Sequence, residues 1–276
     1  MRHLSVAMMV LVTWLGCVNG LSAQDAAKEP EYSEAFKEAY GAAINHFNQN
    51  QLDEALKKLE EAEKLQSGLS ETLNLRGAIL VRMKKLEEAA ATFQKLVQQD
   101  PKNPIPVFNL GESFFLQKKY AESKKHFQAF LAMPDTSTNA LGQYKVFLCD
   151  LMLGNKAEVD KTINSLRPSP VSPLYYFVNS AVNFKAGNTE EARGYVASAF
   201  NIYPGGMNSA FADSFIELGW LTQEEVGQVG VVDAAALKSL SQENAPSQAT
   251  NAGGASGPLS LDALLPDLDG KSPKKN

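Results

Sequence analysis

Histidine, cysteine and paired carboxylates are the residue types that most often carry catalysis or bind metals. In this 276-residue sequence they lack the spacing that such chemistry requires. His46 and His126 have no sequence-adjacent partner that would form a proton relay, and Cys149 lies in the apolar stretch KVFLCDLML. There is no Gly-rich phosphate loop, no His-Glu-x-x-His pattern and no cysteine pair at metal-ligand spacing. We therefore expect no enzyme, no cofactor and no metal site, and an enzyme with an unrecognised site is the least favoured alternative.

The charge balance argues against a polyanionic partner. The sequence has 26 Lys and Arg residues against 31 Asp and Glu residues, which gives a formal net charge of −5. Binding to nucleic acid needs clustered basic side chains that neutralise phosphates, and the body of the chain has no such block. We therefore expect no nucleic-acid partner.

The first 23 residues have the layout of an export signal. Arg2 and His3 form a short basic start, the apolar run 4–15 is too short to span a membrane, and Leu21-Ser22-Ala23 is a plausible cleavage site. The mature chain would begin at Gln24, be periplasmic or secreted, and start with a linker over residues 24–34. Cys149 would then be its one cysteine, so no internal disulfide could form.

Cys17 supports an alternative maturation. Leu15-Gly16-Cys17 resembles the end of a bacterial lipobox, in which the cysteine is lipidated and becomes the first residue. Trp14 and Leu15 depart from that motif, so we place the soluble exported form first. A membrane contact is expected only if Cys17 is lipidated. In that case the protein would be a lipid-anchored subunit of an envelope assembly or transport complex.

A pattern of small and apolar residues returns along the chain. Ala89, Phe93 and Leu96 form one stripe of a helix that Asp100-Pro101 ends. The same positions recur 34 residues earlier and 34 residues later. The earlier set is Ala55, Leu59 and Ala62, and the later set is Ser123, Phe127 and Phe130.

A 34-residue period with two helices per unit resembles the tetratricopeptide repeat family. Residues 70–103, the unit that starts at Pro104 and residues 172–204 fit the pattern strongly, whereas 36–69 and 138–167 fit weakly. Ser123 and Ser180 depart from the Ala or Gly that the pattern favours. The resemblance implies an all-α, right-handed solenoid of about five helical hairpins over residues 35–204. Capping helices over 205–241 and a disordered tail over 242–276 would follow.

The resemblance also implies where a partner would bind, because the first helix of each unit lines the concave groove in that family. Asn109 could hydrogen-bond a peptide backbone, and Arg82 would flank the groove. The aromatic residues of the expected groove could contact a partner, or they could instead pack between repeats. The sequence leaves both roles open. Repeat domains that grip peptide carboxyl termini use Lys and Asn where this chain has Tyr40, Ile44 and Leu75, so we do not expect that mode. The expected groove residues are Tyr40, Phe47, Asn74, Arg82, Phe108, Asn109, Phe115, Phe177 and Phe184.

These observations predict a non-enzymatic scaffold or adaptor that binds another protein or peptide. In the C-terminal part, Thr222 and Glu225 form a predicted capping box with Leu221 and Val226 as a hydrophobic staple, and Asp233 could cap a further helix. The tail segment 258–270, PLSLDALLPDLDG, alternates leucines with acidic residues. It could dock on a partner or on the chain's own groove, or it could be a solvated tail with incidental leucines.

Overall fold

The computed structural model describes residues 32–136 and 138–229. The predicted export signal with Cys17, the helix expected after Asp233 and the segment 258–270 lie outside these residues. The described part of the chain divides between residues 149 and 150 into two compact units.

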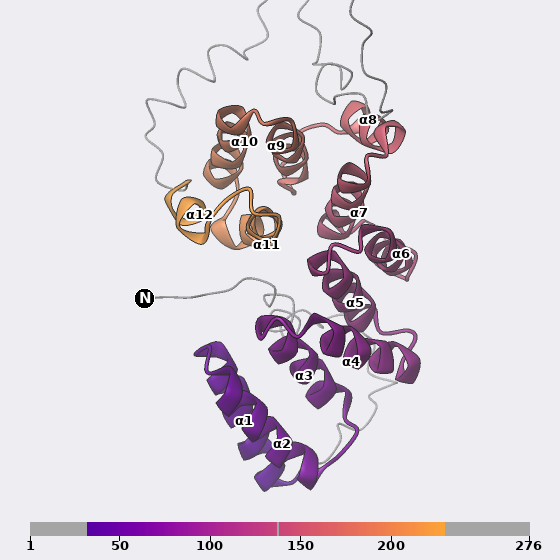
Figure 1. The fold of residues 1–276 in the computed structure, drawn as a ribbon, viewed down its shortest axis with the longest axis vertical. Helices are drawn as coiled ribbons and strands as arrows, with labels where there is room; N and C mark the ends of the chain where they lie inside the picture. Colours follow the sequence, from indigo (N-terminus) through magenta and orange to yellow (C-terminus); the bar gives the residue numbers. More distant parts are fainter. Residues whose placement is uncertain (1–31, 137, 230–276) are drawn as a thin grey trace, which may run out of the picture. The chain divides into compact units, whose positions relative to one another are not determined.

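The first unit consists of helices that pack in sequence order (Figure 1). Helices α1 and α2 lie side by side, and α3 with α4 and α5 with α6 repeat the arrangement. The division between the units falls inside α7. The helices are α1 (Glu34–Asn48), α2 (Leu52–Leu65), α3 (Ser70–Arg82), α4 (Leu86–Gln99), α5 (Pro104–Leu116), α6 (Tyr120–Leu131) and α7 (Ala140–Leu153).

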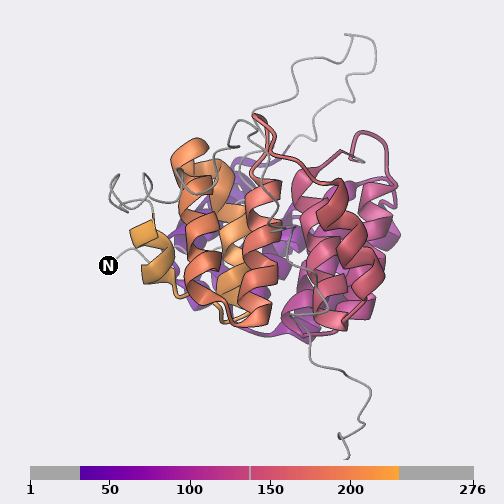
Figure 2. The same cartoon turned by 90° about the horizontal axis from the view of Figure 1, so that it is seen from above.

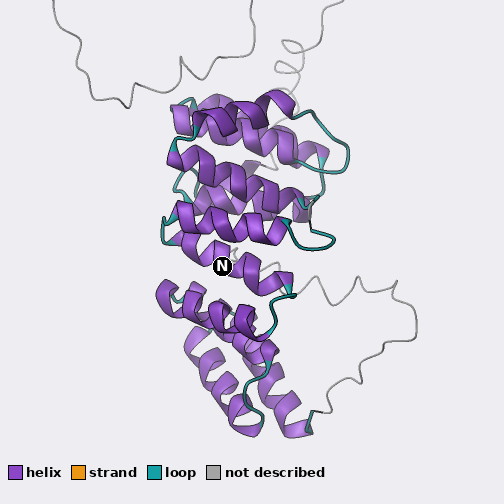
Figure 3. Cartoon of the chain, turned by 90° about the vertical axis from the view of Figure 1, so that its right-hand side faces the viewer, coloured by secondary structure: helices purple, strands orange, loops and turns teal. Residues whose placement is uncertain are grey.

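The second unit continues with helices, of which α9, α10 and α11 lie side by side (Figure 2). Within the described ranges the β-structure is limited to an isolated bridge between Ser169 and Ser172, and Figure 3 accordingly shows helices joined by loops. The predicted all-α fold of consecutive helical hairpins is confirmed. The helices are α8 (Lys156–Ser165), α9 (Leu174–Ala186), α10 (Thr189–Ile202), α11 (Gly205–Glu217) and α12 (Gln223–Val229).

Small residues allow the two helices of a hairpin to touch. A Cβ at Gly77 of α3 would lie 2.5 Å from the ring of Phe93 in α4, and one at Gly111 of α5 would lie 2.9 Å from the ring of Phe127 in α6. Both contacts are closer than real carbon atoms approach, so glycine is required for this packing. The 34-residue spacing of the two glycines therefore reflects a repeated helix contact.

The two serines that depart from the repeat pattern are accommodated by hydrogen bonds. Ser123 Oγ donates to the Gly111 carbonyl at 2.9 Å, and Ser180 Oγ donates to the Ala192 carbonyl at 2.8 Å. Both serines are fully buried, and a buried hydroxyl is tolerated when its donor is satisfied. Each hydrogen bond joins the two helices of one hairpin.

The turns inside the hairpins share a left-handed backbone residue after the first helix. Lys84 has φ +62° and Lys118 has φ +60°, whereas Gly187 occupies the corresponding turn of the second unit with φ +85°. A residue with a Cβ is disfavoured in this region, so the two lysines are held there by the surrounding hairpin.

The core of the second unit is aromatic. Phe177 of α9 stacks on Phe211 of α11 with ring centroids 5.2 Å apart, and Phe184 meets Phe215 at 5.1 Å. Trp220 covers Phe184 at 5.7 Å. Helix α11 thus buries its apolar face against the hairpin of α9 and α10.

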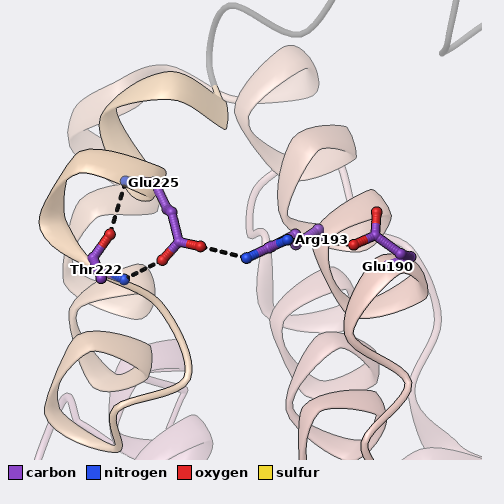
Figure 4. Close-up of polar contacts among 4 residues, drawn as sticks. All are labelled: Glu190, Arg193, Thr222 and Glu225. Carbon is purple, nitrogen blue, oxygen red and sulfur yellow. Dashed lines mark hydrogen bonds and ion pairs between the residues drawn. The ribbon is translucent and has the colours of Figure 1, made fainter.

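The predicted capping box forms at the start of α12 (Figure 4). Thr222 Oγ1 accepts from the Glu225 backbone N–H at 3.2 Å, and Glu225 Oε2 accepts from the Thr222 backbone N–H at 2.6 Å. The other carboxylate oxygen of Glu225 pairs with Arg193 of α10, which also lies 3.3 Å from Glu190. The cap therefore also fixes α12 to α10.

Candidate protein-binding surface

In the first unit, the predicted groove rings are buried. Phe108 packs its ring against Phe127 and Phe130 of α6 at 5.2 and 5.1 Å. Phe115 packs against Tyr120 at 5.4 Å, and Phe47 lies beneath Arg82. The exposed fractions of Phe47, Phe108 and Phe115 are 1%, 4% and 2%. Of the two uses that the sequence left open, packing is the one that the geometry of the described chain provides.

The predicted groove rings of the second unit, Phe177 and Phe184, are also buried. They lie in the core between α9 and α11. Their exposed fractions are 0% and 8%. Periodicity places the two rings on one face of α9, but a later helix covers that face. A contact of these rings with a partner stays a prediction, and it would require α11 to move.

The predicted groove residues that carry polar groups form a set that we call the polar row. Its members are Tyr40 of α1, Asn74 and Arg82 of α3 and Asn109 of α5. All four lie on first helices of consecutive hairpins in the first unit. Tyr40, Asn74 and Arg82 are half-buried, and Asn109 is 9% exposed.

Tyr40 stands at the α1 side of the polar row. Its ring stacks on Phe36 at 5.7 Å, and its hydroxyl donates to the Glu71 carbonyl of α3 at 3.4 Å. Loss of hydration, with a smaller contribution from the Glu71 carboxylate, raises the pKa of Tyr40 to about 12. The hydroxyl therefore stays protonated at neutral pH and can act as a hydrogen-bond donor.

An amide pair joins α3 to α5. Asn109 Nδ2 donates to Asn74 Oδ1 at 3.1 Å. Within the described residues, Asn74 Nδ2 and Asn109 Oδ1 have no hydrogen-bond partner. One is a donor and the other an acceptor, so together they match the N–H and C=O of an extended peptide.

Arg82 lies across the ring of Phe47. Its Cζ is 3.8 Å from the ring centroid, and its Nη1 donates to the Phe47 carbonyl at 2.6 Å. Its Nε is buried and has no hydrogen-bond partner among the described residues. Loss of hydration lowers the pKa of the guanidinium below its usual value. Arg82 is thus a partly desolvated cation held in a fixed orientation.

A buried ion pair between α7 and α5 was not found by sequence reasoning. Lys145 Nζ of α7 lies 2.9 Å from Glu112 Oε2 of α5, and the two side chains are 2% and 13% exposed. The ammonium also lies 4.8 Å from the Phe115 ring. The available signal was a lysine inside the apolar run YKVFLC, 33 residues after a glutamate. A cation in such a run needs a buried partner.

No described helix is long and apolar enough to cross a membrane. The described residues also contain no group of three or more His, Cys, Asp or Glu side chains that could hold a metal ion.

Stacked two-helix units with glycine contacts at a 34-residue spacing define a helical repeat protein. Residues 40–104 match the family model of the tetratricopeptide repeat. This class is typically a non-catalytic scaffold for interactions between proteins, and no enzyme family is indicated. The matched residues include Tyr40, Asn74 and Arg82 of the polar row.

A search of curated proteins finds no match. Nine solved chains match in structure. One of them is described as "Functional Characterization of Pseudomonas Aeruginosa pilF" and is 13% identical, with a TM-score of 0.45. That alignment covers 76% of this chain and 98% of the other.

Proposed function

We propose that the chain is a non-enzymatic scaffold that binds an extended segment of another protein along the polar row. The observation that carries the proposal is the amide pair of Asn74 and Asn109. Its free donor and acceptor lie on adjacent first helices, where they can bind the backbone of a peptide of any sequence. Tyr40 would add a hydroxyl donor and an aromatic face.

In this proposal the buried rings Phe108 and Phe115 support the site and are not its first contacts with the partner. Phe108 and Phe115 pack on α6, so they hold α5 and its Asn109 in a fixed orientation within the hairpin. A rigid row loses little conformational entropy on binding. The rings therefore support the site without touching the partner.

Site-specific cross-linking in the native host tests the proposal. A photo-reactive phenylalanine analogue at Tyr40 replaces one half-buried ring with another, whereas the same analogue at Gln94, an exposed residue of α4, is the control. Mass spectrometry of the adducts should identify a distinct protein captured from Tyr40 only. The double change Asn74→Leu and Asn109→Leu should remove this adduct without loss of helical circular dichroism. Equal capture from both positions, or none from Tyr40, would contradict the proposal.

The place of action that we propose is the bacterial cell envelope, in a periplasmic or secreted form. Its support is the layout of residues 1–23, with a basic start, an apolar run and a small-residue cleavage site. The competing form is a lipid-anchored subunit of an envelope complex, supported by Leu15-Gly16-Cys17. Incorporation of labelled fatty acid that Cys17→Ser abolishes would establish the lipid-anchored form. N-terminal sequencing that begins at Gln24 would establish the soluble one.

A further inference from the structure

Arg82 differs from the other half-buried arginines of the described helices. Arg76, on the same helix α3, donates from Nε and Nη2 to the Glu63 carboxylate at 3.0 and 2.5 Å. Arg193 pairs with Glu225 and Glu190. Arg82 has no ion pair with any described carboxylate, and its one hydrogen bond is to a carbonyl. A partly desolvated guanidinium without an anion is unfavourable, because one carbonyl and one ring replace only part of its lost hydration.

The arrangement around Arg82 is suited to an incoming anion. The Phe47 ring and carbonyl fix the plane of the guanidinium, so little side-chain entropy remains to be lost on binding. A guanidinium presents a fork of N–H donors that a carboxylate can bind with two parallel hydrogen bonds. Nη1 is bonded to the Phe47 carbonyl, whereas the Nη2 donors of that fork make no hydrogen bond with a described residue.

We infer that the segment bound along the polar row carries an acidic side chain that pairs with Arg82. The inference rests on the proposed function and adds the chemical class of the partner: an acidic peptide segment of another protein. The carboxylate supplies the negative charge that Arg82 lacks within the described chain. The amide pair holds the peptide backbone, and Arg82 selects for the charge.

The distance along α3 sets the position of that acidic residue. Asn74 and Arg82 are eight residues apart, which corresponds to about 12 Å along a helix axis and about 80° around it. An extended peptide advances about 3.3 Å per residue. The acidic residue should therefore lie about three or four residues from the peptide unit that the amide pair binds. This separation is a testable signature of the site.

Phage display tests the inference. The full chain is the bait, and the library consists of random peptides of about a dozen residues. Wild-type protein should enrich peptides with one recurrent Asp or Glu. Synthetic peptides in which that residue is Asn or Gln should bind about tenfold more weakly, because a charge-assisted pair is lost. The Arg82→Gln chain should bind acidic and amide peptides equally. Arg76→Gln is the matched control, since that arginine is already paired and its change should leave selection as in wild type.

The outcomes separate this inference from the proposed function. Enrichment without acidic residues, or acidic enrichment that survives Arg82→Gln, would overturn the inference and leave the scaffold proposal standing. No enrichment by any chain that is folded by circular dichroism would overturn both. A third outcome concerns the chain's own segment 258–270. If peptides are enriched only after Asp262, Asp267 and Asp269 are changed to Asn, this segment competes for Arg82. That result would overturn the assignment of the acidic segment to another protein.

Discussion

Arg82 of α3 lies over the ring of Phe47 of α1, with Cζ 3.8 Å from the ring centroid and Nη1 bonded to the Phe47 carbonyl. The two residues are 35 apart in sequence, so the contact joins the first helices of adjacent hairpins. It fixes the one cation of the polar row. The stability of the α1–α3 packing and the orientation of Arg82 are therefore coupled.

Phe47→Leu should lower the free energy of unfolding by about 1–2 kcal/mol, because a smaller side chain replaces a fully buried ring and the contact of that ring with Arg82 is lost. Urea denaturation followed by circular dichroism measures the change. Tyr40→Leu, at a half-buried ring on the same helix, is the matched control and should cost less. An equal cost for both changes would mean that the Phe47 contact adds nothing to stability.

Gly77→Ala should destabilise the chain by about 1–3 kcal/mol, since the added carbon would lie 2.5 Å from the Phe93 ring. Gly41→Ala, in α1 with no atom within 4 Å of the added carbon, should stabilise it by about 0.5–1 kcal/mol. Opposite signs in urea denaturation are the expected result. Combining Gly77→Ala with Phe93→Leu should cost less than the sum of the two single changes, because the smaller side chain relieves the clash. Strict additivity would contradict this account of the contact.

Lys84→Gly should stabilise the chain by about 0.5–1 kcal/mol, because glycine adopts φ +62° without the cost that a Cβ imposes. The same replacement at Lys95, an exposed residue inside α4, should destabilise it by about 1 kcal/mol. Thermal and urea unfolding of the two variants provide the comparison. Destabilisation by Lys84→Gly would imply that the lysine side chain makes a contact that stabilises the turn.

Acid should loosen the start of α12. Hydrogen bonds from Thr222 and the charge of Arg193 lower the pKa of the Glu225 carboxylate. A group with a lowered folded-state pKa stabilises the fold above its unfolded pKa, and this contribution is lost as pH falls through the folded value. The capping box and the pair with Arg193 should therefore weaken below the usual carboxylate range of about pH 4.

The fluorescence of Trp220 reports this loss, because Trp220 stacks on Phe184 two residues before the capping box and Trp14 is the sole other tryptophan. Its emission in wild type should change as the pH falls through that range. In Glu225→Gln, which cannot ionise at this position, the step should be absent and the emission should be shifted already at neutral pH. An identical pH profile for the two proteins would rule out Glu225 as the titrating group.

The local features of this fold were predictable because they depend on neighbours in the sequence. The stripe of Ala89, Phe93 and Leu96 and the capping box of Thr222 with Glu225 each lie within one helix or at its start. Helical periodicity and capping chemistry fix such contacts without knowledge of distant residues. The sequence therefore predicted the all-α hairpins and the polar members of the candidate site.

Only the tertiary structure decided which faces of the first helices stay accessible. A spacing of seven places Phe108 and Phe115 on one side of α5, but it does not say whether α6 covers them. The pairs of Arg82 with Phe47 and of Lys145 with Glu112 likewise join residues about one repeat apart, where the helix crossing sets the distance. Burial and pairing between repeats depend on how successive hairpins stack, and that stacking is a property of the packed chain and not of any single helix.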